Sequence, residues 1–316
     1  MRKLLVVVAI FAVLFSVVSC RSTPDEAPPP VVQAAPAPPP PPPPPAPVTP
    51  APERERISSL RVGQIEVHVL VDSERDGNTN IIPDASEAIL SRYIPAAGFK
   101  HPTNAFLIRN RGQNILIDTG FGNAIFEKLE ELRVRPEDIN AILLTHLHGD
   151  HIGGLQRDGR PLFPRATIYL DNRELEHFTR IAPNQGVIDA LNAYGQNVVT
   201  FDAAPLGFVF REIVPGVSAI ANYGHTPGHT VYMVSSGRGR LLIAGDFLHV
   251  ALVQFPHPEI SATFDMNQAA AAASRRQILE YAARLRIPIG GMHIVYPGIG
   301  NVEADGNGFR FIPIQQ

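Results

Sequence analysis

The chain has 316 residues, of which 45% are hydrophobic and 18% charged, so it can bury a sizeable core. Its 27 basic and 30 acidic residues give a net charge of −3, and this balance argues against a surface built for nucleic acid. Cys20 is the only cysteine, which excludes an intramolecular disulfide and leaves the rest of the chain without a thiol nucleophile.

The first 19 residues have the composition of an export signal. Arg2 and Lys3 precede an apolar run over residues 4–18, which is too short for a comfortable membrane span. The sequence Val-Val-Ser-Cys at 17–20 resembles a bacterial lipobox, in which Cys20 is lipidated and becomes the mature N-terminus. A secretory signal cut nearby and an uncleaved anchor are the alternatives, and each of them also predicts export. Because Arg21 gives no reason for retention at the inner membrane, we expect the periplasmic face of the outer membrane.

Residues 20–56 are the predicted linker. Within them, residues 24–52 contain 16 prolines in 29 residues. Such a segment lacks backbone donors and stays extended, so at ~3.1 Å per residue it could hold a domain roughly 90 Å from a membrane. The globular domain is expected over residues 57–316. Loss of residues 1–19 would leave 25 basic against 30 acidic residues, a net charge of −5.

The globular part alternates between short strands and helices. Alternating apolar residues at 65–71 predict a half-buried strand, and residues 81–104 are expected to be irregular, either a loop over a pocket or plain surface covering. A hairpin of strands 105–109 and 114–117 around Arg111-Gly112 follows. The remaining predictions are helices at 123–133, from Asp171 and at 269–285, and strands at 139–144, 166–170, 198–201, 208–214, 217–222, 241–244 and 287–291.

Three histidines and an aspartate stand within six residues directly after the 139–144 strand: His146, His148, Asp150 and His151. Imidazole and carboxylate suit zinc and related divalent ions. Because side chains alternate along an extended chain, His146 and His148 can face one point, while Asp150 and His151 on the following turn can face a second. The motif therefore predicts a metal centre that could serve two ions, since burying these groups unpaired would be costly.

Further polar residues follow other predicted strands. The tight loop Gly-His-Thr-Pro-Gly-His at 224–229 can hold a rigid histidine ligand. Asp246 follows the 241–244 strand, where one carboxylate could bridge two ions, and His293 follows the 287–291 strand. Asp118 follows the 114–117 strand, where it either caps a turn or holds the second N–H of a ligand histidine.

In this order, over nearly all of residues 57–316, these motifs resemble the signature of the metallo-β-lactamase superfamily. The resemblance implies an α/β (α+β) fold, the αβ/βα sandwich of two mixed β-sheets flanked by helices. It implies that His225 braces its loop and that Asp118 supports a ligand. The implied metal sites share Asp246 and are completed by His146, His148 and His229 in one and by Asp150, His151 and His293 in the other.

Two residues narrow the resemblance. Asp246 argues against the true β-lactamases with a cysteine ligand at that point, and His148 argues against flavodiiron relatives, which have an acid there. The segments 245–250, 253–255, 264–265, 297–300 and 308–311 resemble the methyl parathion hydrolase group, whose members hydrolyse organophosphate triesters and in several cases open lactones or cleave aryl esters.

The pocket departs from that group. The chain has no tryptophan, where the best-known members line the pocket with one, and Phe178 stands in that place. This favours lactones and aryl esters over phosphotriesters. A helical Phe178 could also belong to the core. Phe121 and His249 are expected in the pocket or behind a ligand, and His177 on the surface.

The ligands predict the chemistry. Two divalent ions, zinc first and manganese, iron or cobalt as alternatives, would lower the pKa of a shared water and supply hydroxide at neutral pH. Asp150 or Asp246 could accept the proton and pass it to the leaving group. We therefore expect a dinuclear hydrolase of small, neutral, ester-like substrates. The alternatives are a thioesterase similar to glyoxalase II and a metal-binding surface module without turnover, and a homodimer is left open.

Overall fold

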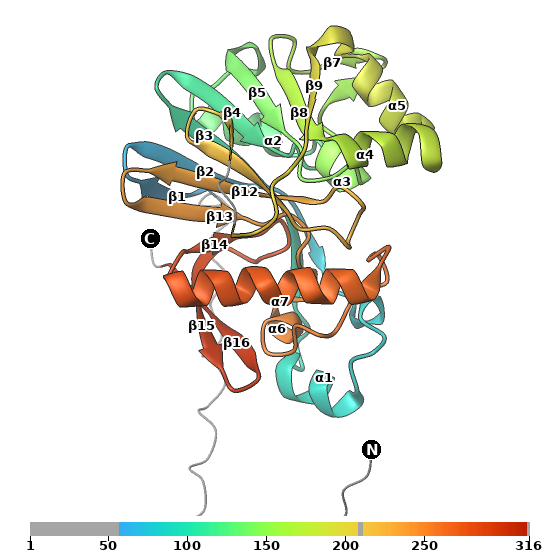
Figure 1. Cartoon of the computed structure of the whole chain (residues 1–316), viewed down its shortest axis with the longest axis vertical. Coiled ribbons are helices and arrows are strands. Elements are labelled where there is room, and N and C mark those ends of the chain that lie inside the picture. Colours follow the sequence, from blue (N-terminus) through green and yellow to red (C-terminus); the bar gives the residue numbers. More distant parts are fainter. Residues whose placement is uncertain (1–56, 208–210, 315–316) are drawn as a thin grey trace, which may run out of the picture. The chain divides into compact units, whose positions relative to one another are not determined.

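The computed structural model describes residues 57–207 and 211–314, so the predicted export signal, the proline-rich linker and Cys20 lie outside the described residues. Within those two ranges, no helix is both long and apolar enough to cross a membrane. The described residues fold around two large β-sheets with helices against their outer faces (Figure 1).

The first sheet is mixed and has seven strands in the order β1-β2-β3-β4-β5-β8-β9. Neighbours from β1 to β4 are antiparallel, and those from β4 to β9 are parallel. The strands are β1 (Ile57–Val62), β2 (Ile65–Asp76), β3 (Lys100–Asn110), β4 (Gln113–Ile117), β5 (Ile139–Leu143), β8 (Thr167–Asp171) and β9 (Val198–Phe201).

The second sheet also has seven strands, in the order β10-β11-β12-β13-β14-β15-β16. Only the β13–β14 pair is parallel among the pairs that join these strands. The strands are β10 (Glu212–Val214), β11 (Val217–Ala221), β12 (Thr230–Ser236), β13 (Gly239–Ile243), β14 (Ile289–Gly290), β15 (Ile299–Asp305) and β16 (Gly308–Pro313). A separate small hairpin pairs β6 (Gln156–Arg157) with β7 (Arg160–Pro161).

Alternation of side chains assigns each strand residue to one of two apolar layers. In β4, Ile115 and Ile117 enter the core between the sheets, together with Tyr232 and Ile243 from the second sheet. Leu116 points to the opposite face, where it packs with residues of the covering helices. Because both faces are buried over the last three residues of β4 and of β5, each strand ends in an apolar run.

Helices cover the outer faces of both sheets. On the first sheet, α2 (Ile125–Glu131) and α5 (Gln185–Asn192) bury apolar residues such as Leu129 and Val187. On the second, α7 (Gln268–Leu285) lies across the strands and buries Ile278 and Leu279 (Figure 1). The predicted sandwich of two mixed sheets flanked by helices is confirmed. The remaining α-helices of the described residues are α1 (Glu87–Tyr93), α3 (Gly149–Ile152), α4 (Asn172–Glu176), which continues as a π-helix over His177–Ile181, and α6 (Ala251–Gln254).

The prediction that residues 81–104 are irregular was wrong. This stretch contains α1, which begins where the side chain of Ser86 accepts the N–H of Ile89. The helix is short and packs its apolar residues, including Leu90, in a small cluster around Val253 of α6. The stretch also contains the beginning of β3, which pairs with β2 as far back as Lys100.

Candidate metal centre

The polar residues that follow five strands meet at one edge of the two sheets. Parallel neighbours present their carboxyl ends on the same side, which applies to β4 with β5 and to β13 with β14. The residues concerned are Asp118 after β4, His146 to His151 after β5, His225 and His229 after β11, Asp246 after β13 and His293 after β14.

The first group of potential ligands consists of His146, His148, His225 and Asp246, whose ligand atoms all lie within 4.8 Å of one another. Nε2 of His146 and Nδ1 of His148 are 2.9 Å apart. Nε2 of His225 is 3.1 Å from the first of these atoms and 3.0 Å from the second. Three imidazole nitrogens thus converge on one point, beside Oδ2 of Asp246 at 3.4 Å from His225 Nε2.

The second group consists of Asp150, His151, Asp246 and His293. Oδ1 of Asp246 is 3.2 Å from Nε2 of His151 and 3.2 Å from Nε2 of His293. The Asp150 carboxylate completes the ring, with Oδ1 3.7 Å from Nε2 of His151 and Oδ2 3.6 Å from Nε2 of His293. Asp246 belongs to both groups, so its carboxylate lies between two points at which ligands gather.

These residues fit divalent metal ions. Nε2 of His151 and Oδ1 of Asp246 are fully buried and have no hydrogen-bond partner among the described residues, which is costly for polar atoms. Both atoms point to the centre of the second group. Nitrogen and oxygen donors of this kind are those that zinc accepts, and each group offers four of them. The cluster is therefore suited to divalent ions.

Asp118 fixes two parts of the centre. Its Oδ2 is 2.6 Å from Nδ1 of His151, which directs the other ring nitrogen of that histidine to the second group. Its two oxygens also accept the backbone N–H of Thr145 at 2.8 Å and the hydroxyl of Thr145 at 2.6 Å. The structure thus places Asp118 behind the ring of His151, and Asp118 ties the end of β4 to the turn that carries the motif.

The remaining ring nitrogens of two further histidines are held in the same manner. Nδ1 of His293 donates to the carbonyl oxygen of Pro102 at 2.8 Å. Nδ1 of His225 is 2.9 Å from Oδ1 of Asp265, and Oδ2 of Asp265 accepts from the buried guanidinium of Arg275 at 3.1 Å. Each Nε2 is thereby directed to the centre.

The assignment of the two histidines in the 224–229 loop must be corrected. The structure brings His225, and not His229, to the first group. Both nitrogens of His229 are engaged elsewhere: Nδ1 donates to the carbonyl of Asn222 at 3.0 Å, and Nε2 accepts the backbone N–H of Asp246 at 2.9 Å. The ring lies against Gly245, where a Cβ would come within 2.6 Å of Nε2. His229 is therefore the brace, and His225 faces the centre.

The structure also places the three residues expected in the pocket or behind a ligand. His249 is buried with Nε2 3.2 Å from Oδ2 of Asp246, and its Nδ1 has no partner among the described residues. Phe178 is buried 6.0 Å from the ring of His148. Phe121 is 40% exposed and is brought neither into the two groups nor into the cavity described below.

Three buried residues near the centre were not found from the sequence. Asp265 holds His225, and Glu174 bonds the loops on both sides of the first group. The ring of His101 lies against that of His293 with centroids 4.3 Å apart, and burial lowers the pKa of His101 to about 3. A single carboxylate or imidazole in a strand, helix or loop carries no local pattern, so only the tertiary contact identifies these residues.

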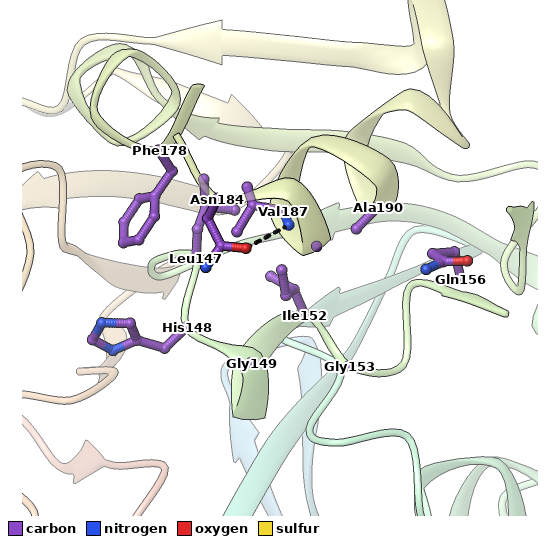
Figure 2. Close-up of a pocket in the computed structure, with 11 residues that line it drawn as sticks. Leu147, His148, Gly149, Ile152, Gly153, Gln156, Phe178, Asn184, Val187 and Ala190 are labelled. Carbon is purple, nitrogen blue, oxygen red and sulfur yellow. Dashed lines mark hydrogen bonds between the residues drawn. The ribbon is translucent and has the colours of Figure 1, made fainter. Parts of the chain in front are cut away.

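A cavity of about 270 Å³ adjoins the first group. Figure 2 shows it between the turn at His148, the ring of Phe178 and the start of α5, where Asn184 caps the helix by accepting the N–H of Val187 at 3.2 Å. Its lining contains no acid, lysine or arginine. The residues are Leu147, His148, Gly149, Ile152, Gly153, Gln156, Phe178, Asn184, Gly186, Val187 and Ala190.

The two groups differ in electrostatic character. Burial lowers the pKa of His148 to about 4 and holds the pKa of His146 well below its usual range, so these rings are neutral at pH 7. Burial alone would lower the pKa of His151, but the carboxylates of Asp246 and Asp150 raise it well above its usual range. Burial would raise the pKa of Asp246, but the surrounding histidines, His151 first, lower it strongly. The carboxylates of the second group therefore favour positive charge at its centre.

The sequence matches one family model, and the structure superposes on solved structures of hydrolases. Residues 98–290 match the family described as the Metallo-beta-lactamase superfamily. The structure superposes on AidC, a dizinc quorum-quenching lactonase solved with the product N-hexanoyl-L-homoserine, with a TM-score of 0.74 and 24% identity, covering 82% of this chain and 98% of AidC. It superposes on the hydrolase AbOPH with a TM-score of 0.72 and 27% identity over the same shares of the two chains.

Two curated relatives match in part. Atrochrysone carboxyl ACP thioesterase of Passalora fulva is 32% identical over 151 residues, which are 46% of this chain and 37% of the relative. Hydroxyacylglutathione hydrolase of Yersinia pestis is 30% identical over 149 residues, which are 43% of this chain and 49% of the relative. The chain thus spans about half or less of either relative's length.

Proposed function

The chain belongs to the metallo-β-lactamase superfamily, and from this premise we propose that it is a dinuclear metal-dependent hydrolase of neutral ester-like substrates, lactones and aryl esters first. The observation that carries the proposal is the position of Asp246, which is shared by two complete groups of nitrogen and oxygen donors. A carboxylate that belongs to both groups could be shared by two divalent ions, and two such ions would supply a hydrolytic nucleophile.

Some residues of the centre would hold the ions, and another would transfer a proton. Two divalent ions bound here would supply a hydroxide nucleophile at neutral pH and polarise the carbonyl of the substrate. His146, His148 and His225 would hold one ion, and Asp150, His151 and His293 the other. Asp150 is half-buried, whereas Asp246 is fully enclosed, so Asp150 is the better placed to accept a proton and return it to the leaving alkoxide.

The surroundings favour a substrate without charge. The cavity beside His148 is lined by apolar residues such as Ile152, Phe178 and Val187, and by no ionised side chain. An apolar group attached to the scissile carbonyl could enter it while the carbonyl itself faces the centre. The cavity therefore supports esters and lactones with an apolar acyl part, and the absence of tryptophan from the chain still leaves phosphotriesters as the less favoured substrates.

The test is hydrolysis of a chromogenic aryl ester and of an N-acyl lactone by purified protein. We expect turnover that a chelator abolishes and that added zinc restores. Asp246→Asn, which keeps the volume of the side chain and removes its charge, should be inactive. Metal-loaded protein without turnover on any ester, lactone or thioester would show instead a metal-binding module, and the proposal would fail.

Thioester hydrolysis is the second candidate. What supports it is the partial similarity to an acyl-carrier-protein thioesterase and to a hydroxyacylglutathione hydrolase. The same donors could serve it, because an ester and a thioester present the same carbonyl. Adding an acyl thioester to the substrate panel distinguishes the two: a ratio of kcat/KM that favours the thioester by more than about tenfold, or 1.4 kcal/mol, would assign the protein to this class.

We also propose that the protein is exported and attached to the periplasmic face of the outer membrane through lipid on Cys20. The support is the sequence at residues 17–20 after a short basic and apolar segment, followed by the proline-rich residues 24–52. A tether of this kind would keep the hydrolase near the membrane while leaving its centre open to small substrates.

A further inference from the structure

Glu174 of α4 connects the two loops that carry the first ligand group. Its side chain is buried, with the residue 1% exposed. Oε1 accepts the backbone N–H of Leu147 at 2.9 Å, and Oε2 accepts the backbone N–H of Gly228 at 2.9 Å. Leu147 lies between His146 and His148, and Gly228 lies three residues after His225. One carboxylate therefore spans two loops that are about eighty residues apart in the chain.

We propose that Glu174 is a positioning residue of the metal centre, which sets the distance between the His146–His148 turn and the His225 loop and thereby the affinity for the first ion. The inference rests on the metal-binding part of the proposed function. It differs from a role in the core because the two bonded groups belong to ligand loops and to no regular element. The backbone N–H of Thr230 and the carbonyl of Thr145 join the bases of these loops at 2.9 Å, and Glu174 adds two further bonds, one of them at Leu147 between His146 and His148.

Only a carboxylate meets both loops in this way. Each oxygen faces a backbone donor, and a carboxylate has two acceptors and no donor. An amide of the same size would accept one N–H and turn its own N–H₂ towards the other. Burial raises the pKa of Glu174 to about 7, whereas the side chain of Thr226 and the backbone N–H groups of Leu147 and Gly228 favour the ionised carboxylate.

The 224–229 loop packs closely against the backbone of α4 at Gly228. A Cβ on Gly228 would come within 2.4 Å of the backbone nitrogen of Glu174, so only glycine allows the approach. A second bond runs in the same direction, from the hydroxyl of Tyr223 to Oδ2 of Asp171 at 3.0 Å, and the guanidinium of Arg173 lies 4.5 Å from the Tyr223 ring. The N-terminal turn of α4 thus serves as the support of the loop.

The experiment measures the two zinc affinities of the full chain by competition with a chromogenic chelator. We expect wild type to bind two ions. Glu174→Gln should weaken one of them by about 10- to 100-fold, the range for residues that orient ligands, and leave the other unchanged. Glu176→Gln, an exposed position of the same helix, is the control and should leave both affinities unchanged.

A double variant assigns the weakened ion. If Glu174 acts through the first group, His225→Ala already removes that affinity, and adding Glu174→Gln should cause no further loss in the remaining ion. Gly228→Ala is the second route, because it keeps the carboxylate but pushes the loop away from it, and it should weaken the same ion.

Unchanged zinc affinities in Glu174→Gln, or equal loss at both ions, would overturn the inference. The same holds if Glu174→Gln does not fold and Gly228→Ala binds both ions as wild type does. A wild type that binds two zinc ions and hydrolyses no ester would overturn the proposed function instead, and the role of Glu174 in metal binding would stand.

Discussion

The backbone N–H of Asp246 donates a hydrogen bond of 2.9 Å to Nε2 of His229, whose ring lies directly against Gly245. This contact holds the one carboxylate that belongs to both ligand groups. It also leaves His229 no free nitrogen, since Nδ1 donates to the carbonyl of Asn222. Both ring nitrogens of His229 are therefore used in hydrogen bonds that support the centre, and neither is available to bind an ion.

The first prediction separates the two histidines of this loop. His225→Ala should remove a ligand and reduce tight zinc binding from two ions to one. His229→Ala should keep both ions but leave the Asp246 N–H and the Asn222 carbonyl without partners, which destabilises the protein by about 1–3 kcal/mol for each buried group. Zinc stoichiometry and urea unfolding measure the two effects. Loss of an ion in His229→Ala alone would restore the assignment that the sequence suggested.

The second prediction concerns Asp246 itself. Asp246→Asn should lower kcat by several orders of magnitude for lactone, aryl ester and thioester alike, because both ligand groups lose their shared charge and the chemistry common to all substrates is affected. His177→Ala is the matched control, since this side chain is absent from the groups and from the cavity lining. Near-normal turnover in Asp246→Asn would refute the proposed mechanism.

The ligands could be predicted from the sequence because most of them follow strands at close spacing. His146, His148 and His151 are placed by one strand end and one turn, so the local pattern suffices. His225 and His229 could not be distinguished, since both are histidines of one tight loop and the difference is the packing of His229 on Gly245. His229 and Gly245 lie far apart in the sequence, so no local sequence pattern reveals their contact.

Other features were hidden for related reasons. Asp265 and Glu174 act through partners 40 and 54 residues away. The helix α1 has only seven residues, and tertiary packing on α6 rather than a long apolar periodicity stabilises it. Strands such as β4, β5 and β13 were predicted because their buried ends are apolar runs, whereas β1, β12, β15 and β16 were not predicted.

The third prediction is a pH dependence of stability that originates away from the metal centre. Burial, with Arg109, lowers the pKa of His68 in the folded protein below its ordinary value of about 6.5. The unfolded chain therefore takes up a proton as the pH falls below about 6.5 while the folded protein does not, and stability is lost in that range. The side chain is neutral in the fold, with Nδ1 2.8 Å from the hydroxyl of Ser59.

His68→Gln isolates this contribution, because all other titrating groups are the same in both proteins. The free energy of unfolding in urea should fall less steeply for the variant than for wild type between pH 7.5 and pH 5. Parallel curves over that range would show that His68 contributes nothing to the dependence.

The fourth prediction tests the membrane attachment. Wild type should sediment with the outer membrane, whereas Cys20→Ala should not be lipidated, because the thiol that carries the lipid is gone. Membrane fractionation with detection of the chain measures this. Ser19→Ala, which keeps the cysteine, is a suitable control. Equal soluble release of wild type and Cys20→Ala into the periplasm would contradict the lipid anchor.

The fifth prediction concerns the cavity beside His148. Phe178→Ala should widen it and change the ranking among lactones, aryl esters and phosphotriesters, while zinc content stays at the wild-type value. The reason is that a residue touching only the variable part of the substrate alters differential binding rather than the common chemistry. Equal scaling of kcat/KM for all substrates would contradict the assignment of Phe178 to a substrate pocket.

Filling the same cavity from its other wall should give the opposite result. Gly186 of α5 lines it, and a Cβ there meets only Oδ1 of Asn184, at 3.4 Å, so a larger side chain has room. Gly186→Leu should lower kcat/KM for long acyl chains by about 10-fold or more relative to short ones, since a few lost methylene contacts at ~0.8 kcal/mol each suffice. Gln185→Leu adds the same side chain to an exposed position outside the lining and should leave the chain-length profile unchanged. If Gly186→Leu also leaves that profile unchanged, the acyl part of the substrate lies elsewhere.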